Sequence, residues 1–313
     1  MSKVTVIGAG NVGATCANVL AHEDICNEIV LIDIQEGIAR GKALDTWQQA
    51  PIDGYSTRVV GGGNDAYPLS ADSDIVIITA GIPRKPGMSR DDLISTNANI
   101  VVGVTREVLR HSKDPIIIVV SNPLDVMTYA CWKASGLSDR RVLGMAGILD
   151  TARYRAFLAE EIGCSPKDIS AMLMGGHGDT MVPLPRYTTV SGIPVTELVD
   201  AERLNAIIER TKFGGGELVN LMGTSAWYAP GAAAAQMAVS ILKNERRIYP
   251  CCVRLTGQYG IDDLFVGAPV KLGRQGIEHV IELKLTEEEK ALLHRSAAAV
   301  REVVQALDNM NIL

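Results

Sequence analysis

The chain has 313 residues, of which 47% are apolar, and it carries a formal net charge of −6. This length and apolar share predict one large or two modest folded domains with a sizeable core, and they exclude a disordered chain. The acidic balance, with a pI near 5.5, argues against nucleic acid binding. It does not exclude a small anionic substrate, because a few local arginines outweigh a weak overall field. The longest apolar stretches have the length of strands, so no membrane association is expected.

The beginning of the chain and its cysteines indicate a cytoplasmic protein. The N-terminus runs directly into the strand pattern Lys3–Ile7, which leaves no room for a signal peptide. The six cysteines form no C-x-x-C pair and no Cys/His cluster with zinc spacing, so we expect no metal site. They are interpreted as reduced and mostly packed thiols.

Strand and helix patterns alternate in the first half of the chain. We expect strands at 3–7, 28–33, 57–60, 74–79, 115–120 and 141–144, and helices at 11–22, 36–50, 91–111 and 124–135. This alternation predicts right-handed crossovers and an α/β fold with a doubly wound parallel sheet.

The pattern changes after residue 147. A helix is expected from Ile148 to Ile162, ended by Gly163, and strand-like and helical runs then mix without a regular alternation. We therefore predict a dinucleotide-binding domain over residues 1–147 and an α+β domain over 148–313. The last helix is expected to begin at Thr286 through a capping box with Glu289. Its expected apolar face consists of Leu292, Leu293, Ala297, Val300 and Val304.

Two runs of glycine interrupt these patterns. Gly61–Gly63 is expected to form a turn after a strand. Gly214–Gly216 lies within a helical pattern and lacks the Lys-Ser/Thr of a phosphate-binding P-loop, so we expect a break or bend in that helix.

The motif Gly8-Ala-Gly-Asn-Val-Gly13 closes the first strand and opens the first helix. In this position Gly8 permits a tight turn, Gly10 lets the backbone approach a pyrophosphate, and Gly13 allows close helix–strand packing. Asp33 ends the second strand, where a carboxylate accepts hydrogen bonds from the adenosine ribose and repels a 2′-phosphate. The spacing favours NAD over NADP, and the alternative is a tight turn with an unrelated aspartate.

Two arginines follow the strand pattern Asp74–Ile78. The segment from Thr79 to Asp92 contains Arg84 and Arg90, with prolines and glycines that predict a mobile loop, and it enters a helix at Ser89 through a capping box. The loop leaves the carboxyl end of a strand, where open α/β sheets bind ligands, and arginine there suits a carboxylate or phosphate. Solvated surface arginines are an equal alternative from this segment alone.

Asp150, Arg153 and His177 are the candidates in the second half. Asp150 and Arg153 share a helix face, which from these two residues alone is best explained by an intrahelical ion pair. His177 lies in the glycine-rich segment Met174–Asp179, where the imidazole has little side-chain cover. A histidine in such a loop, available to an aspartate, is a candidate general acid/base.

With these motifs in this order, the chain resembles the lactate/malate dehydrogenase superfamily, and within it the malate dehydrogenases that are similar to lactate dehydrogenases. The resemblance covers nearly the whole chain. It includes the glycine motif with Asp33 and the four segments Thr79–Arg90, Val120–Leu124, Leu149–Arg153 and Gly176–Asp179. It implies an N-terminal Rossmann domain, a C-terminal substrate domain and a homodimer or homotetramer.

The resemblance also implies the roles of individual residues. His177 exchanges the proton of the substrate hydroxyl, Asp150 orients the imidazole and stabilises its charged form, and Arg90 polarises the reacting carbonyl when its loop closes. The cofactor is NAD, and the residues implied to contact it are Gly8, Gly10, Asn11, Gly13, Asp33, Asn97, Val120 and Asn122.

The implied substrate is malate or oxaloacetate. Arg153 grips the C1 carboxylate, Arg84 holds the second carboxylate, Asn122 bonds near the substrate oxygen, and Ser225 lines the pocket. The lactate enzymes of the family usually have Gln at the position of Arg84, whereas the malate enzymes have Arg.

Three other functions stay open at this stage. A lactate or other 2-hydroxyacid dehydrogenase is disfavoured by Arg84. An NAD-dependent glycosidase needs a metal held by Cys and His, and no Cys lies near His177 in the sequence. An NAD-binding sensor without activity has no reason to keep both loop arginines and His177.

Overall fold

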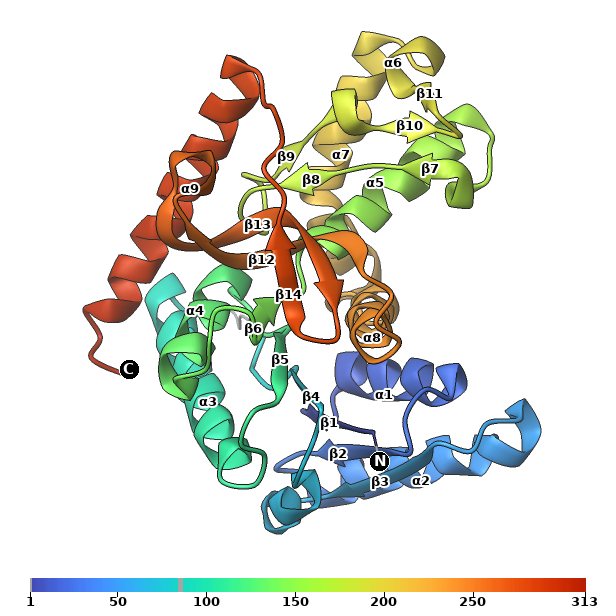
Figure 1. Ribbon diagram of the computed structural model, residues 1–313, viewed down its shortest axis with the longest axis vertical. Coiled ribbons are helices and arrows are strands. Elements are labelled where there is room, and N and C mark those ends of the chain that lie inside the picture. The colour runs from blue at the N-terminus through green and yellow to red at the C-terminus, as the bar shows by residue number, and fades with distance from the viewer. Residues whose placement is uncertain (1, 84–86) are drawn as a thin grey trace.

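The computed structural model describes residues 2–83 and 87–313. A nine-stranded sheet crosses the molecule in the order β14-β13-β12-β6-β5-β4-β1-β2-β3 (Figure 1). The strands from the first half of the chain are parallel to one another. They are β1 (Lys3–Ile7), β2 (Glu28–Ile32), β3 (Arg58–Gly62), β4 (Ile75–Ile78), β5 (Ile116–Val119) and β6 (Val142–Gly144).

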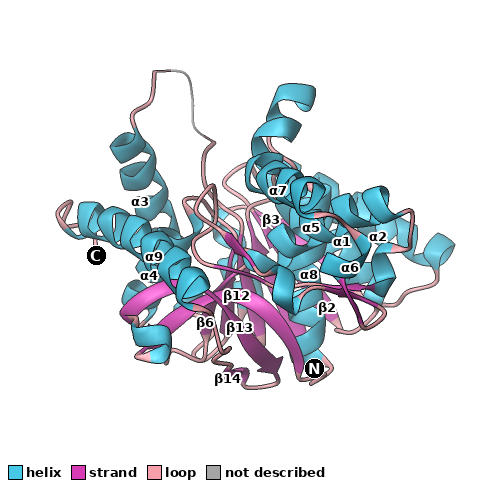
Figure 2. Ribbon diagram, turned by 90° about the horizontal axis from the view of Figure 1, so that it is seen from above, coloured by secondary structure: helices cyan, strands magenta, loops and turns pink. Residues whose placement is uncertain are grey.

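Helices cover both faces of this sheet (Figure 2). On one side lie α1 (Asn11–Glu23), α2 (Glu36–Asp53) and α8 (Tyr228–Leu242), and on the other α3 (Arg90–Leu109) and α4 (Leu124–Ser135). Ile75 and Ile77 of β4 join the first core, while Val76 and Ile78 join the second. Because both faces are covered, the strand is apolar throughout rather than alternating. The predicted doubly wound sheet is confirmed, and its order reverses between β1 and β4, which makes a switch point for ligand binding.

The second half of the chain extends the same sheet. The strands β12 (Arg247–Thr256), β13 (Asp262–Gly273) and β14 (Gly276–Val280) are antiparallel, and β12 pairs with β6 through Cys252 opposite Gly144. The helix α5 (Gly147–Ile162) begins close to the predicted boundary. Since the sheet continues across that point, the division into residues 1–147 and 148–313 stays a prediction.

The rest of the second half is α+β, as expected. The strands β7 (Ile169–Ser170), β10 (Thr189–Val190) and β11 (Ile193–Pro194) form a small sheet, and β8 (Leu173–Met174) pairs with β9 (Val182–Pro183). With α6 (Val195–Leu198), α7 (Ala201–Met222) and α5 they enclose a third core around Tyr154 and Leu158.

Both glycine runs differ from the prediction. Gly61 and Gly62 belong to β3, and a Cβ on Gly61 would lie 2.3 Å from the carbonyl oxygen of Ala39, so the glycine lets α2 pack on the strand. Gly214–Gly216 lies inside an unbroken α7. A Cβ on Gly214 would lie 3.3 Å from Cδ of Arg153, so close packing against α5 explains this glycine, and the expected break is absent from α7.

The final helix, α9 (Glu287–Asp308), has the predicted capping box between Thr286 and Glu289. Leu293, Ala297 and Val300 of its expected apolar face are buried. Val304 is partly buried, whereas Leu292 is 37% exposed, so that member of the face was wrong. The helix packs on α3, α4 and β13.

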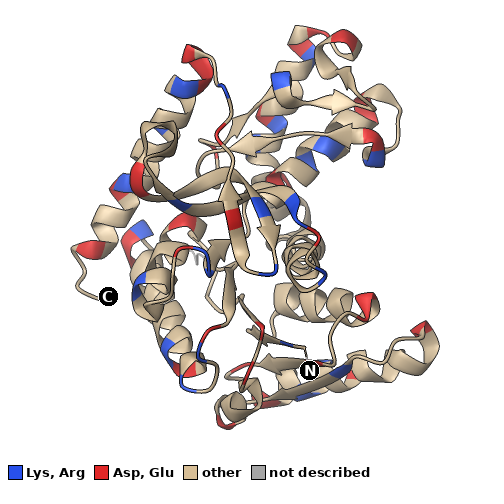
Figure 3. Ribbon diagram, in the orientation of Figure 1, with Lys and Arg blue, Asp and Glu red and all other residues tan. Residues whose placement is uncertain are grey.

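The cysteines are free, as expected; Cys164 is partly exposed and the other five are buried. Within residues 2–83 and 87–313, no helix combines the length and apolar character needed to cross a membrane. Acidic and basic residues lie intermixed on the same elements (Figure 3), and many pair at the surface, as Arg203 does with Glu161 and Arg210 with Glu217. Such exposed pairs contribute little stability each.

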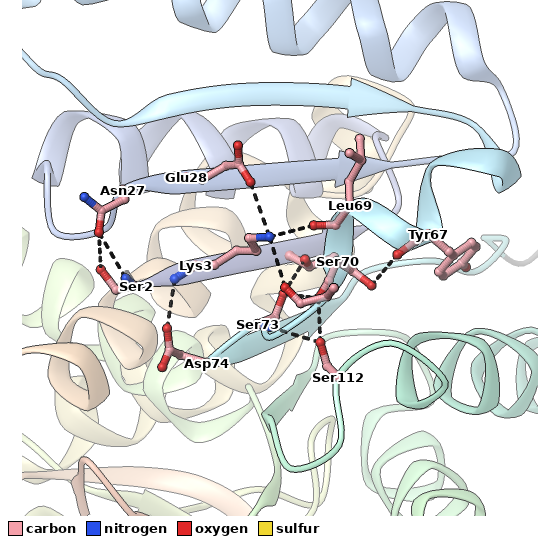
Figure 4. A network of polar contacts seen from close by, with 12 residues as sticks. Ser2, Lys3, Asn27, Glu28, Tyr67, Leu69, Ser70, Ser73, Asp74 and Ser112 are labelled. Carbon is pink, nitrogen blue, oxygen red and sulfur yellow. Dashed lines mark hydrogen bonds and ion pairs between the residues drawn. The ribbon is translucent and has the colours of Figure 1, made fainter.

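A polar network ties the amino ends of β1 and β4 together (Figure 4). The backbone N–H of Lys3 donates to Asp74 at 2.8 Å, and Lys3 Nζ donates to the carbonyl oxygens of Leu69 and Ala71 at 2.9 and 3.0 Å. A cavity of about 550 Å³ that includes Asp74 and Arg141 lies at this edge. Open α/β sheets bind ligands at the carboxyl ends of their strands, and this cavity lies at the opposite edge.

Candidate active site

The turn between β1 and α1 depends on glycine at two positions. Gly8 has φ +106°, and a Cβ there would lie 2.6 Å from Oγ1 of Thr79. A Cβ on Gly13 would lie 1.9 Å from the carbonyl oxygen of Gly8. Neither position has room for a Cβ. Glycine at Gly8 therefore permits the predicted tight turn, and glycine at Gly13 permits the predicted close contact between helix and strand.

Gly10 differs, because nothing in the protein lies within 4 Å of a Cβ built there. It precedes α1 as the N-cap residue and gives the helix no side-chain cap, so the first N–H groups of α1, beginning at the exposed Asn11, remain available. Open space at a helix N-terminus fits a pyrophosphate, which accepts from those N–H groups and is attracted by the helix dipole. The residues present thus fit a dinucleotide.

Asp33 follows β2 and is held by backbone donors. Its Oδ2 accepts from the N–H of Ala9 at 2.7 Å and its Oδ1 from the N–H of Gln35 at 2.9 Å. Lys42 of α2, which belongs to no sequence motif described above, donates to the carbonyl oxygen of Ala9 at 2.8 Å. The carboxylate is fixed beside the glycine turn and retains lone pairs for ribose hydroxyls.

Asn97 and Asn122 connect the segments that follow β4 and β5. Asn97, buried on α3, accepts from the N–H of Ile82 at 2.8 Å and donates to the carbonyl oxygens of Ile82 at 3.1 Å and Asn122 at 2.7 Å. Val120 directly follows β5, and its N–H donates to the carbonyl oxygen of Ile78. A cis peptide bond joins Asn122 to Pro123. Asn97 therefore acts first as a tie between two loops, and its contact with a cofactor stays a prediction.

The arginine-bearing loop is described in part. Arg84 lies outside the described residues. Arg90 is the first residue of α3, after the predicted capping box, in which Ser89 Oγ accepts from the N–H of Asp92 at 3.0 Å. Arg90, Asn122 and His177 line one cavity of about 330 Å³, which lies between α3, α4, α9 and the histidine loop. The fold thus brings together three predicted site residues from distant parts of the chain.

A carboxylate links the other two candidates. Asp150, 2% exposed on α5, accepts from Nδ1 of His177 at 2.8 Å through Oδ2 and from Nη1 of Arg153 at 3.2 Å through Oδ1. Because Nδ1 faces a carboxylate, it carries the proton of the neutral ring, and Nε2 is left as the atom that exchanges a proton. The predicted intrahelical ion pair and the predicted His–Asp pair are both present.

The electrostatics favour a charged imidazole. Burial alone lowers the pKa of His177, but the charge and hydrogen bond of Asp150, together with Asp125, outweigh it and raise this pKa above the usual value. His177 is 21% exposed at its side chain, so it can reach a ligand in the cavity.

Two further placements complete the site. Ser225 lies in an exposed segment between α7 and α8 and is not among the residues that line the 330 Å³ cavity, so its contact with a substrate stays a prediction. Asp125 was missed, although it stands one residue beyond the segment Val120–Leu124. Its Oδ2 accepts from the backbone N–H of His177 at 2.9 Å. The available signal was an acidic residue at the start of the predicted helix 124–135, directly after that segment.

A Rossmann sheet with this glycine turn, an aspartate at the end of β2 and an aspartate-supported histidine defines a nicotinamide-dependent oxidoreductase that moves a proton. Residues 2–144 match the family model described as lactate/malate dehydrogenase, NAD binding domain. Residues 148–310 match the model described as lactate/malate dehydrogenase, alpha/beta C-terminal domain. The chain belongs to the lactate/malate dehydrogenase family.

Individual relatives are similar over almost their full length. A malate dehydrogenase of Cytophaga hutchinsonii is 66% identical over 98% of this chain and 98% of its own. A structure of malate dehydrogenase from Salinibacter ruber has a TM-score of 0.95 and 56% identity, covering 99% of this chain and 98% of that one. A lactate dehydrogenase from Cryptosporidium parvum, solved with lactic acid and the dinucleotide, has a TM-score of 0.94 at 36% identity, covering 98% of each chain. The fold is thus similar to enzymes named for both activities, while identity is higher to the two malate dehydrogenases named here than to this lactate dehydrogenase.

Proposed function

We propose that this protein catalyses the reversible, NAD-dependent oxidation of malate to oxaloacetate, a reaction of the tricarboxylic acid cycle. The observation that carries the proposal is the Asp150 carboxylate bonded to both His177 and Arg153, because it joins a proton-transfer group to a carboxylate-binding group. The high identity to malate dehydrogenases and the presence of Arg84 in the sequence support malate as the substrate.

His177 is the acid/base residue in this proposal. In malate oxidation, neutral His177 accepts the proton of the C2 hydroxyl at Nε2, and Asp150 stabilises the imidazolium that forms. In the reverse direction, protonated His177 returns that proton to the ketone oxygen. Bound NAD supplies the acceptor for the hydride that leaves C2.

Three arginines orient the substrate. Arg153 pairs with the C1 carboxylate, and its Nη1 also donates to Asp150 at 3.2 Å, which orients the guanidinium. Arg90, brought in as its loop closes, stabilises negative charge on the C2 oxygen, and Asn122 bonds nearby. Arg84 pairs with the second carboxylate. Closure expels water, which strengthens these contacts.

NAD is the proposed cofactor, with its pyrophosphate at Gly10 and Asn11 and its ribose at Asp33. The charge of Asp33 opposes the 2′-phosphate of NADP. Asn97, Val120 and Asn122 are proposed to border the nicotinamide end.

The test is an NADH-consumption assay with oxaloacetate and then with pyruvate. We expect much faster turnover with oxaloacetate. Comparable or faster turnover with pyruvate would favour a lactate dehydrogenase, the second candidate, to one of which the fold is similar with a TM-score of 0.94.

We also propose a cytoplasmic homodimer or homotetramer with closed symmetry. Large apolar side chains are exposed on α2 and around the α7–α8 connection, including Ile52 at 82%, Leu221 at 75% and Tyr228 at 71%. Exposed apolar surface of this kind is typical of protein–protein contacts, and a second copy is the occupant proposed here. Light scattering at micromolar concentration is expected to show two or four copies, and a monomer would contradict the proposal.

A further inference from the structure

The loop that carries His177 is anchored by side chains from two different helices. The N–H of Gly176 donates to Ser296 Oγ of α9 at 2.8 Å, and Ser296 Oγ donates to Thr180 Oγ1 at 3.1 Å. The N–H of His177 itself donates to Asp125 Oδ2 of α4 at 2.9 Å. These contacts fix the backbone on either side of the imidazole, independently of the Asp150 contact to the ring.

Asp125 is an unusual anchor because it is a buried acid. It is 6% exposed, and its Oδ1 has no hydrogen-bond partner among the described atoms, although the Cys252 thiol faces the carboxyl. Burial raises the pKa of Asp125, and the bond from the His177 N–H opposes that rise. Among the ion pairs of the described residues, none includes Asp125. A carboxylate left in this position is costly unless positive charge lies nearby.

The charge that fits this requirement is the imidazolium of His177. The two carboxylates approach the histidine from different elements, Asp150 of α5 at ring atom Nδ1 and Asp125 of α4 at the backbone N–H. Both raise the pKa of His177. Protonation of His177 therefore stabilises Asp125 as an anion, and ionised Asp125 in turn favours the protonated histidine.

We propose that Asp125 is a positioning residue for proton transfer. It holds the His177 backbone in place, and its buried carboxylate acts with Asp150 to favour the protonated histidine from which keto acid reduction starts. The inference deepens the proposed function and rests on it. The alternative is that Asp125 only anchors the histidine loop and does not affect the protonation of His177.

Other charged and titratable groups surround His177. From α5 come Asp150 and Arg153, and Arg153 opposes protonation of the histidine. Arg90 of α3 and Asp179 of the histidine loop line the same cavity. β12 presents the Cys252 thiol to Asp125, and α9 presents uncharged Ser296 and Val300. Among these groups, Asp150 and Asp125 are the carboxylates that raise the pKa of His177.

Two substitutions separate the two roles. Asp125→Asn keeps an oxygen that accepts from the His177 N–H but removes the negative charge. Asp125→Ala removes both the acceptor and the charge. Asp308→Asn is the matched control, since Asp308 accepts from Tyr129 of the same helix α4 at 2.8 Å but is exposed and carries no contact to the histidine loop in the described structure.

The first measurement is the NMR titration of the His177 ring protons, assigned with His177→Asn, because this readout does not depend on turnover. In Asp125→Asn the midpoint is expected to fall by about 0.5–1 pH unit, and in Asp308→Asn to stay at the parent value. An unchanged midpoint in Asp125→Asn overturns the proposal, even if the parent enzyme proves highly active.

The second measurement is kcat for oxaloacetate reduction against pH, with NADH affinity measured by nucleotide fluorescence. Reduction needs protonated His177, so activity is expected to decline at a lower pH in Asp125→Asn. Asp125→Ala is expected to lose a further tenfold or so in kcat at every pH, because the histidine is no longer held in place. NADH affinity is expected to change less than about twofold, since Gly10 and Asp33 are untouched.

If Asp125→Ala does not fold, the titration and pH profile of Asp125→Asn still test the proposal. A parent enzyme inactive on oxaloacetate would instead overturn the proposed function while leaving the titration interpretable.

Discussion

The two halves of the molecule build their parts of the site in different ways. The dinucleotide half uses backbone: Gly8, Gly10 and Gly13 shape a turn within six consecutive positions, and Asp33 follows on the neighbouring strand. The substrate side of the site uses side chains from distant elements of both halves, with His177 held by Asp150 of α5, Asp125 of α4 and, through its neighbour Gly176, Ser296 of α9. A local site tolerates change elsewhere in the chain, whereas an assembled site depends on the whole fold.

The largest expected effect is at the assembled site. His177→Asn removes the proton-transfer group and is expected to lower kcat by about 10²–10⁴-fold. NADH affinity is expected to remain close to that of the parent, because the cofactor contacts lie in the other half. Steady-state kinetics and fluorescence titration measure the two quantities. Near-normal turnover would remove the histidine from the mechanism.

Asp150→Asn breaks the same site through the partner of the histidine. We expect a fall in kcat of about 10²-fold or more, since the imidazolium loses its counter-charge. Asp150 raises the pKa of His177, so its loss lowers that pKa. Malate oxidation needs neutral His177 and is then expected to begin at lower pH, while oxaloacetate reduction is expected to decline at lower pH. The rates of malate oxidation and oxaloacetate reduction, measured against pH, show whether both profiles move to lower pH. Profiles that do not move would show that Asp150 does not set the pKa of His177.

Arg84→Gln tests substrate choice. If Arg84 pairs with the second carboxylate, its removal leaves that carboxylate buried and unpaired, a cost of about 2–5 kcal/mol. We expect kcat/KM for oxaloacetate to fall by about 30- to several-thousand-fold, while pyruvate turnover rises. Kinetics with both keto acids decide the matter. An unchanged oxaloacetate-to-pyruvate ratio would mean that Arg84 does not touch the substrate.

Asp33→Ser tests the local site. Loss of a charged acceptor is expected to weaken NAD binding by about 1.5–3 kcal/mol and to relax discrimination against NADP. Because His177 and its partners are untouched, kcat at saturating NAD is expected to change little. Binding titrations with both dinucleotides provide the test, in which an unaltered NAD/NADP preference would refute the role given to Asp33.

The smallest effect separates two glycines of one turn. Gly13→Ala forces a Cβ to 1.9 Å from the carbonyl oxygen of Gly8 and is expected to destabilise the protein by about 1–3 kcal/mol. Gly10→Ala places its Cβ in open space, so the unliganded protein is expected to keep its melting temperature while NADH binds more weakly. Thermal unfolding with and without NADH compares the two variants. Equal unliganded melting temperatures would show that the turn relaxes around Gly13.

The same contrast explains what the sequence predicted well. The alternation of strands and helices, the glycine turn and Asp33 follow from local patterns, and the structure has them close to the predicted ranges. The predictions for Gly214 and Gly61 were wrong because each glycine makes room for a residue of another element. Gly214 packs against Arg153 of α5, and Gly61 packs against Ala39 of α2. Asp125 and Lys42 were missed for a related reason, since their partners are single backbone groups far along the chain.

The backbone hydrogen bonds between Gly175 and Gly267 bear on the order in which the parts of the site are synthesised. The two glycines exchange both backbone hydrogen bonds at 2.9 Å, and a Cβ on Gly267 would lie 2.4 Å from the carbonyl oxygen of Gly175. The histidine loop is therefore fastened to β13 and then, through Ser296, to α9. Because the ribosome extends the chain from the N-terminus, the residues of the glycine turn and Asp33 are synthesised long before Gly267 and Ser296. A nascent chain that has not yet reached α9 thus contains the residues that fit a dinucleotide but lacks Ser296, which holds the loop of the proposed acid/base residue.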